Sequence, residues 1–157
     1  MLKKYLFIFF LSMVPVIELR GAIPFAVNWE LDYWTALTIC AIGNMLPVPI
    51  IYLFARKVLH WGADKKYIGK FFRFCIEKGE RGGQKLIKRA GRGGLFVALM
   101  LFVGIPVPGT GAWTGTLAAS FLNMGIRSTA ASVSLGVIIA GIIMGVASTG
   151  VFSIFGI

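Results

Sequence analysis

The stretch "PVIELRGAIP", residues 15–24, interrupts the first apolar segment of the chain, which runs from Tyr5 to Val27. Glu18 and Arg20 lie inside it, between two prolines. A charged side chain near the centre of a bilayer costs about 2.5 kcal/mol or more. A broken membrane helix also frees backbone groups that lipid cannot satisfy. The stretch therefore predicts a broken membrane segment whose polar groups are buried in protein or line a polar cavity.

The composition predicts an integral membrane protein. Of the 157 residues, 57% are hydrophobic and 14% are charged, and the mean hydropathy is +0.83. A soluble domain has about 25% charged residues. Twelve of the 16 Lys and Arg residues lie between Arg56 and Gly94. Between hydrophobic segments, such a cluster indicates a cytoplasmic segment that touches anionic lipid headgroups, rather than nucleic acid.

Four apolar segments stand out in the chain. Two are uninterrupted spans and two are broken about midway by proline and glycine, as in "GIPVPGTGAWTG", residues 104–115. The broken segments are Tyr5–Val27 and Leu95–Gly125, and the spans are Trp34–Ala55 and Thr129–Ile157. Pro15-Val16 matches Pro106-Val107, and Gly21-Ala22 matches Gly111-Ala112. The pattern predicts two copies of one unit, a broken segment followed by a span.

We expect a single membrane domain over residues 1–157, an all-α protein of the multi-pass cell-membrane type. Repeat 1 covers residues 1–58, the linker 59–94 and repeat 2 residues 95–157. If each broken segment is a re-entrant hairpin, the repeats are inverted, the linker is cytoplasmic and both termini share the other face. The alternative has four full spans and cytoplasmic termini. Lys3 and Lys4 begin a stretch that resembles a signal peptide, and we expect it to be retained.

The linker combines an amphipathic part and a glycine-rich part. Residues Lys65–Lys78 place apolar side chains at helical spacing with basic residues opposite, which predicts a helix along the membrane surface. Packing of that helix on the protein is the alternative. The stretch that follows, residues 77–94, is rich in glycine and is expected to be mobile.

Glu18 and Arg20 are the leading candidates for a binding site. They are two positions apart, so on a helix they point to different faces and each needs another partner. Arg20 suits a phosphate or carboxylate, and Glu18 is the candidate proton carrier. The alternative is that both charges bond backbone groups exposed by the breaks.

The second break offers backbone amides to an anion. Gly109 and Gly111 flank Thr110 and permit close approach of a ligand to the backbone. A half-helix that begins near Ala112 would present free amides. A turn between two short helices is the simpler alternative. Asn44 could line the cavity or bond a neighbouring helix.

Several other functions are not indicated by the chain. It has one histidine and two distant cysteines, so we expect no metal, no cofactor and no catalytic residues. Gly141 and Gly145 form a GxxxG pattern, which fits packing within one bundle or the seam of a homodimer.

"PVIELRGAIP" and "PVPGTGAWTG" resemble the signature segments of the small multidrug export protein family. That family is similar to the DedA superfamily of membrane transporters. The resemblance implies two inverted re-entrant hairpins and proton-dependent transport of a phosphate-bearing lipid carrier such as undecaprenyl phosphate. DedA proteins typically carry arginines in the second hairpin, whereas Leu95–Gly125 has no charge. Phosphate binding would then rest on Arg20 and backbone amides, with Arg127 as a third group.

The sequence therefore predicts a membrane transporter of a polyprenyl phosphate, in which Glu18 couples transport to protons. One alternative is a small multidrug exporter, in which Glu18 with Trp29, Trp34 and Trp113 binds a cation. Another is a non-transporting assembly factor, whose working part is the linker. Enzymatic activity is not expected.

Overall fold

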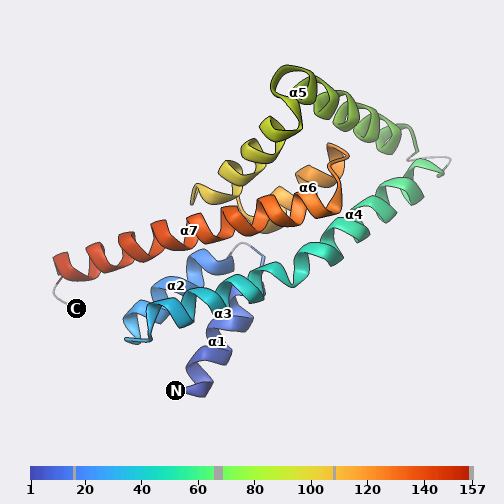
Figure 1. The fold of residues 1–157 in the computed structure, drawn as a ribbon. Coiled ribbons are helices and arrows are strands. Elements are labelled where there is room, and N and C mark those ends of the chain that lie inside the picture. Colours follow the sequence, from blue (N-terminus) through green and yellow to red (C-terminus); the bar gives the residue numbers. More distant parts are fainter. Residues whose placement is uncertain (16, 66–68, 108, 156–157) are drawn as a thin grey trace.

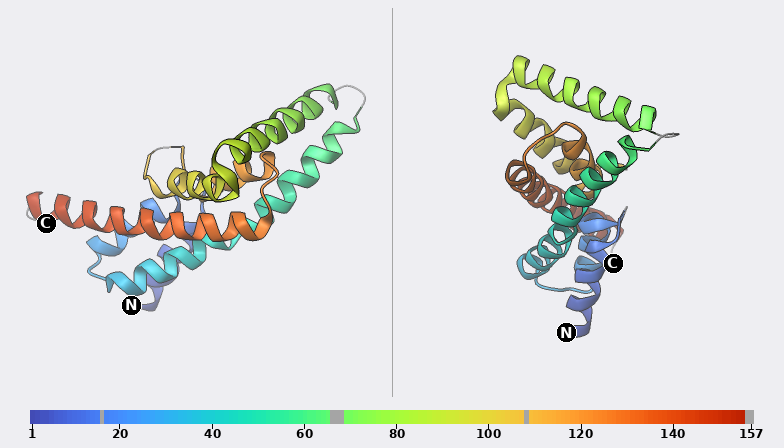
Figure 2. Two further views of the ribbon diagram at one scale, coloured as in Figure 1. Left: turned by 45° about the horizontal axis from the view of Figure 1, so that its top comes forward. Right: turned by 90° about the vertical axis from the view of Figure 1, so that its right-hand side faces the viewer.

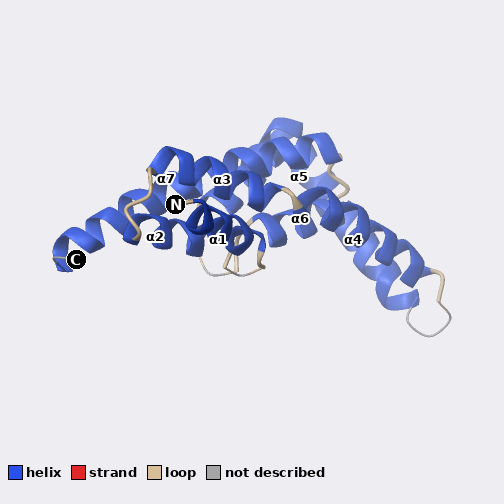
Figure 3. Ribbon diagram, turned by 90° about the horizontal axis from the view of Figure 1, so that it is seen from below, coloured by secondary structure: helices blue, strands red, loops and turns tan. Residues whose placement is uncertain are grey.

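The computed structural model describes residues 1–15, 17–65, 69–107 and 109–155, and these residues form helices and loops without a strand (Figure 1, Figure 3). The prediction of an all-α fold is confirmed for this part of the chain. Its helices are, in chain order, α1 (Leu2–Met13), α2 (Glu18–Asn28), α3 (Tyr33–Met45), α4 (Pro47–Ala63), α5 (Gly69–Gly104), α6 (Ala112–Phe121) and α7 (Ile126–Phe155).

The two halves of the chain have the same order of elements, a helix, a break, a second helix and then a long apolar stretch. Pro15 and Pro106 each lie two residues after the helix that precedes the break, so their predicted match is structurally equivalent. The other predicted match is wrong, because Gly21 lies inside α2 whereas Gly111 precedes α6. The second break is longer than the first, which shifts the alignment after the prolines.

Two helical stretches are long and apolar enough to cross a membrane. They are Tyr33–Ala63, formed by α3 and α4, and Ile126–Gly150 of α7. The first extends beyond the predicted span at its C-terminal end. Its helical hydrogen bonding is interrupted at Leu46, directly before Pro47, which has no amide hydrogen to donate. The two predicted spans are therefore present as helices.

The helices of the two halves pack on each other in a reciprocal pattern (Figure 2). The first helix of each hairpin packs on the long stretch of its own half, α1 on α3 and α5 on α7. The second helix also packs on the other half, α2 on α7 and α6 on α4. The side chains of Leu19, Ile23, Val133 and Val137 are at most 1% exposed and form the centre of the core. Each hairpin is thus held between both halves.

The glycine-rich part of the linker is helical, so the prediction of a mobile segment was wrong. It belongs to α5, whose N-terminal part packs against the end of α6. Gly79 lies against the backbone of Phe121, where a Cβ atom would collide. The small residue therefore serves close helix approach, as glycine does in membrane helix pairs. Arg81 and Glu77 add an ion pair of 3.7 Å on the exposed side.

The amphipathic helix begins at Gly69, and residues 66–68 lie outside the described part of the chain. The alternative, in which this helix packs on the protein, is met in part. Phe72 packs against Gly62 of α4, whereas Phe71 and Phe74 are 66% and 57% exposed. One side of the helix is therefore held by the protein and another presents aromatic rings. Contact of these rings with lipid remains a prediction.

Gly141 and Gly145 serve packing within the chain. A Cβ atom at Gly141 would collide with Leu37, and one at Gly145 would collide with Tyr33. The face of the GxxxG pattern is therefore covered by α3, as the first of the two alternatives predicts.

The N-terminus and the end of α7 lie toward one end of the molecule (Figure 1, Figure 2). The C-terminal end of α4 and the N-terminal end of α5 lie toward the other end. The two breaks lie between these ends, where the hydrogen bonds described below join them.

Candidate substrate site between the two hairpins

The second break folds as a compact loop from Ile105 to Gly111. The Thr110 hydroxyl donates to the carbonyl of Ile105 at 2.8 Å and lies 2.9 Å from that of Val107. The Thr110 amide donates to the same Val107 carbonyl at 3.1 Å. Gly109 has a φ of 87° and Gly111 a φ of 152°, both in the region that favours glycine. The loop reverses the chain between α5 and α6 while keeping part of its hydrogen bonding internal.

Arg20 binds carbonyls at the C-terminal end of α5 and in the loop that follows it. Its Nη1 donates to the carbonyls of Val107, at 2.6 Å, and Thr110. Its Nη2 donates to the carbonyls of Val103, at 3.0 Å, and Ile105, at 3.2 Å, and to Thr110 Oγ1 at 2.9 Å. The last carbonyls of a helix have no partner within it and carry its partial negative charge. One guanidinium therefore satisfies carbonyls at a helix end and in the loop that follows it.

Glu18 binds the N-terminal end of α6. Its Oε2 accepts a hydrogen bond from the Ala112 amide at 3.2 Å, and its Oε1 accepts one from the Trp113 amide at 3.1 Å. The first amides of a helix are unpaired and favour an anion. The residue is 5% exposed, so its charge is held inside the protein. The predicted start of a half-helix near Ala112 is confirmed.

Glu18 and Arg20 thus bracket the second break, with the anion at the start of α6 and the cation at the end of α5. Among the described residues the only ion pair is Arg81 with Glu77, so neither charge uses the other as its direct partner. Gly111 lies directly against the Glu18 carboxylate, where a Cβ atom would collide with both oxygens. The glycine therefore permits the approach of Glu18.

The backbone of Glu18 is strained. Its φ of 51° is positive although it is not glycine, and it is the first residue of α2. Such a conformation costs about 1–3 kcal/mol and persists only where the surroundings impose it. Here the two bonds to α6 hold the side chain across the interface.

Four of the predicted site residues come together at this interface, namely Glu18, Arg20, Thr110 and Gly111. Gly109 is in the same loop, with open space where its Cβ atom would be. These contacts are of the kind expected if the charges bond exposed backbone groups. A role in binding substrate remains a prediction.

Asn44 and Arg127 are not among the residues that hydrogen bond at this interface. Asn44 is 2% exposed, and within the described part of the chain its Oδ1 has no hydrogen-bond partner. Arg127 lies at the start of α7, in a separate cavity. The sequence reasoning missed the carbonyls of Val103, Ile105 and Val107 as partners of Arg20. The prolines of the second break were the signal for them, because a broken helix exposes carbonyls.

The proposed aromatic cage for a cation does not form as one site. Trp29 follows the C-terminal end of α2, about 16 Å along the helix from Glu18, and packs against Phe7 with ring centroids 5.3 Å apart. The indole of Trp34 is part of a different pocket. Glu18 accepts a hydrogen bond from the backbone amide of Trp113, and the Trp113 Nε1 is buried without a hydrogen-bond partner among the described residues.

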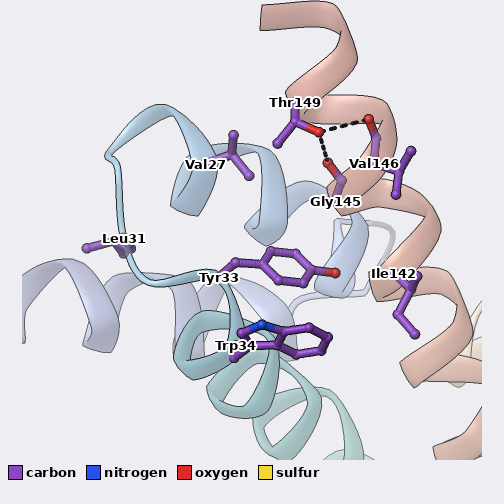
Figure 4. Close-up of a pocket in the computed structure, with 8 residues that line it drawn as sticks. All are labelled: Val27, Leu31, Tyr33, Trp34, Ile142, Gly145, Val146 and Thr149. Atoms are coloured by element: carbon purple, nitrogen blue, oxygen red, sulfur yellow. Dashed lines mark hydrogen bonds between the residues drawn. The ribbon is translucent and has the colours of Figure 1, made fainter.

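A second, apolar pocket of about 410 Å³ lies between the start of α3 and the C-terminal part of α7 (Figure 4). Its lining residues are Val27, Leu31, Tyr33, Trp34, Ile142, Gly145, Val146 and Thr149. The Tyr33 hydroxyl donates to the Gly141 carbonyl at 3.1 Å. The Thr149 hydroxyl lies 3.0 Å from the carbonyl of Gly145 in its own helix. The walls therefore offer rings and aliphatic groups rather than free polar atoms.

The fold and the interface define an all-helical protein with two hairpins that meet at their breaks and two helices able to cross a membrane. The chain belongs to the family described as "Putative small multi-drug export protein", whose model matches residues 18–143. The family and the apolar helices together place the protein in a membrane with a role in export. No curated protein and no solved structure matches the chain.

Proposed function

We propose that the protein is a proton-coupled exporter of a lipid with a phosphate headgroup, such as a polyprenyl phosphate. In this proposal the interface between the two hairpins is the gate. The supporting observation is that the Glu18 carboxylate lies on the amides of Ala112 and Trp113. A helix N-terminus in this position is a binding site for phosphate as well as for carboxylate. Glu18 therefore occupies the place that a substrate headgroup would take.

Proton coupling follows from competition for the start of α6. While Glu18 is ionised, it holds both amides and excludes another anion. A proton on Glu18 removes the charge that strengthens these bonds. The amides then become available to a phosphate, and the nearby Arg20 adds a fixed positive charge. When the phosphate leaves, Glu18 loses its proton and rebinds α6. Each cycle thus moves one proton together with one headgroup.

The lengths of the hairpin helices support re-entrant segments. At about 1.5 Å per residue, α1, α2 and α6 are about 15–18 Å long. The hydrocarbon core of a bilayer is about 30 Å thick. Each hairpin therefore reaches about halfway before it turns back. Broken backbone at that depth is tolerated when it is buried in protein or lines a polar cavity, and hydrogen bonds from Arg20 and to Glu18 satisfy backbone groups of the second break here.

The order of contacts along the molecule supports inverted repeats in one multi-pass membrane domain. The end of α2 and the end of α7 line one pocket, and the end of α6 contacts the linker part of α5. The first hairpin therefore opens toward the termini and the second toward the linker. The basic charge of the linker favours the cytoplasm for that end.

A second candidate function is export of lipophilic cations. It is favoured by the family description and by the apolar pocket lined by Tyr33 and Trp34 (Figure 4). Aromatic faces attract cations, and the neighbouring loop carries the exposed acids Glu30 and Asp32. In this alternative, Glu18 would still control the gate, while the pocket would select the substrate.

The deciding experiment is uptake into proteoliposomes over a series of pH values, with a polyprenyl phosphate in one set and a lipophilic aromatic cation in another. The variants are Glu18→Gln, Trp34→Ala and, as a matched control, Glu30→Gln. Glu30 is an exposed acid outside the interface. We expect the wild type and Glu30→Gln to carry the lipid with the same pH dependence. Glu18→Gln should bind the lipid and lose the pH dependence.

Three outcomes would contradict the lipid proposal. A folded Glu18→Gln protein with the wild-type pH profile would show that Glu18 is not the coupling acid. Uptake of the cation alone, reduced in Trp34→Ala, would favour the second candidate. Uptake of neither substrate by the folded wild type would favour a non-transporting role.

A further inference from the structure

A cavity of about 450 Å³ lies where the bend of α5 meets the start of α7, away from the hairpin interface. Its lining residues are Ile87, Arg92, Leu95, Asn123, Met124, Gly125, Arg127 and Ser128. None of the residues that form the Glu18 and Arg20 bonds is among them. The cavity is therefore separate from the proposed gate.

The cavity is positively charged without a compensating acid. Arg92 and Arg127 come from different helices, are both exposed, and line the same space. In the part of the chain that the structure describes, neither forms an ion pair with a carboxylate. Ser128 and Asn123 add a hydroxyl and an amide to the walls. Two arginines with polar neighbours are the groups that bind a phosphate.

An apolar slot of about 190 Å³ adjoins this cavity. It lies between α5 and α6 and is lined by Leu95, Ala98, Leu99, Phe102, Ala118, Ala119, Leu122 and Met124. Leu95 and Met124 line both spaces, so the slot and the cavity meet at these two side chains. Three alanines in the slot leave room that larger side chains would fill. The cavity and the slot together therefore form one site with a cationic end and an apolar end.

We infer that the cavity and the slot together bind an anionic phospholipid, with its phosphate between Arg92 and Arg127 and part of an acyl chain in the slot. A free phosphate or a nucleotide would use the cavity and leave the slot unfilled. A zwitterionic lipid would bring its own cation to a site that already holds two. The site lies at the linker end of the molecule, where basic residues favour the anionic cytoplasmic leaflet. The lipid is a resident ligand and does not pass the gate.

The bend in α5 places Arg92 at this site. Gly91 has a φ of 71° and a ψ of 178°, and it divides α5 into two helical parts. A residue with a side chain is strained there, although no neighbour lies within 4 Å of its Cβ position. Gly93 is close by, has equally open space and has no positive φ. Gly91→Ala and Gly93→Ala are therefore a matched pair that separates the bend from simple loss of a glycine.

The test uses the full-length protein in phosphatidylcholine vesicles that contain a small share of phosphatidylglycerol with a photoreactive acyl chain. We expect crosslinks to peptides covering 95–102 of α5 and 118–124 of α6. The double substitution Arg92→Ala/Arg127→Ala should reduce labelling roughly tenfold or more, since each basic residue near an anionic surface contributes about 1 kcal/mol. Gly91→Ala should reduce labelling, and Gly93→Ala should not.

The controls decide among the other possible ligands. Lys85→Ala/Arg89→Ala removes two charges from the same helix outside the cavity, and equal loss of labelling in this variant would overturn the proposal. Equal labelling by a photoreactive phosphatidylcholine would overturn the preference for an anion. Displacement of the lipid by inorganic phosphate alone would assign the site to free phosphate. Ala98→Leu fills the slot with the arginines intact, so unchanged labelling in that variant would exclude the slot. Thermal unfolding in detergent identifies variants that fail to fold.

Discussion

The two hairpins differ in what they bring to the place where they meet. The first contributes two charged side chains, Glu18 and Arg20, from the start of α2. The second contributes backbone groups, the carbonyls at the end of α5 and the amides at the start of α6. Its break carries no charged side chain. The halves therefore share the order of their elements but have complementary chemistry.

This difference explains how the backbone groups freed by a broken helix find partners. The unpaired backbone groups at the two ends of the second break have opposite polarity: carbonyls lie at the end of α5 and amides at the start of α6. One cation and one anion, two residues apart on the other hairpin, match them both. A charge pair that is poorly placed for mutual contact is thus well placed to bracket a loop. The predictions below test this division of roles.

The largest expected effect is that of Arg20→Ala. The substitution leaves four carbonyls and a hydroxyl without their shared donor, and it removes the cation nearest to Glu18. Arg20 is partly buried, and a hydrogen bond to a charged group contributes about 1.5–3 kcal/mol where water does not replace it, so the loss of several such bonds at once should exceed the other effects predicted here. The stability of Arg20→Lys should fall between that of Arg20→Ala and that of the wild type. The compact ammonium group of lysine cannot reach all the acceptors that the planar guanidinium of Arg20 reaches. Thermal unfolding in detergent measures both.

Arg127→Ala is the control for this prediction. Arg127 is exposed and forms no hydrogen bond or ion pair within the described part of the chain. Its loss should leave the unfolding temperature close to that of the wild type. If Arg20→Ala unfolds at the same temperature as Arg127→Ala, Arg20 does not hold the second break.

The second largest effect on stability is expected in the second hairpin. It is measured by comparing Gly111→Ala with Gly109→Ala. Both glycines have positive φ, so each alanine adds backbone strain, and the strain is larger at Gly111, whose φ of 152° and ψ of −174° are essentially restricted to glycine. Only Gly111 also has the Glu18 carboxylate against it. Gly111→Ala should therefore be less stable than Gly109→Ala by about 1 kcal/mol or more, because a hydrogen bond to a charged group is disturbed.

A double-mutant cycle between Gly111→Ala and Glu18→Ala isolates this contact. Once the carboxylate is removed, Gly111→Ala should cost only its backbone strain. Costs that simply add would show that Gly111 does not serve the approach of Glu18.

Glu18→Gln should have a smaller effect on stability. The amide oxygen of Gln can still accept from the start of α6, whereas its NH₂ group would face an amide donor. The loss of charge at a helix N-terminus and of one bond amounts to about 1–2 kcal/mol. Unfolding of Glu18→Gln and Glu30→Gln in the same detergent measures it. A Glu18→Gln protein as unstable as Arg20→Ala would indicate that Glu18 is mainly a structural group.

Much of the fold could be predicted because apolar length and proline are strong local signals. Blocks of uncharged residues located α3, α4 and α7, and Pro15 and Pro106 located the breaks. The helical state of the glycine-rich stretch could not be predicted, since it depends on the packing of Gly79 against Phe121. Glycine in a sequence carries no information about which neighbour approaches it.

The candidate site was predictable in its residues and not in its partners. Glu18 and Arg20 stood out because charges are costly in an apolar segment. Their partners are backbone atoms more than 80 positions away, which the type of residue does not reveal. Arg127 was grouped with Arg20 by chemistry alone, and the structure places it beside Arg92.

The smallest expected effect on stability is that of Asp32→Asn. Asp32 is exposed to water and, like Glu18, binds the amide end of a helix. Its Oδ2 accepts from the Thr35 amide at 2.8 Å and the Thr35 hydroxyl at 2.6 Å, so it caps α3 from within the same helix. The bonds from the Thr35 hydroxyl and amide lower the pKa of Asp32. A lowered pKa means that the cap contributes stability above the ordinary pKa of the carboxyl group and loses it as the pH falls through the folded-state value.

Asn caps helices about as well as Asp and does not titrate. The unfolding temperature of the wild type should therefore decline slightly more on acidification than that of Asp32→Asn, and the two should differ little near neutral pH. The transport of Asp32→Asn should keep the wild-type pH profile, because this carboxylate caps its own helix and does not cross between the hairpins. If Asp32→Asn abolished that profile while Glu18→Gln preserved it, the coupling acid would lie in the exposed loop. The distinction between a cap that joins two hairpins and a cap within one helix would then carry no functional meaning.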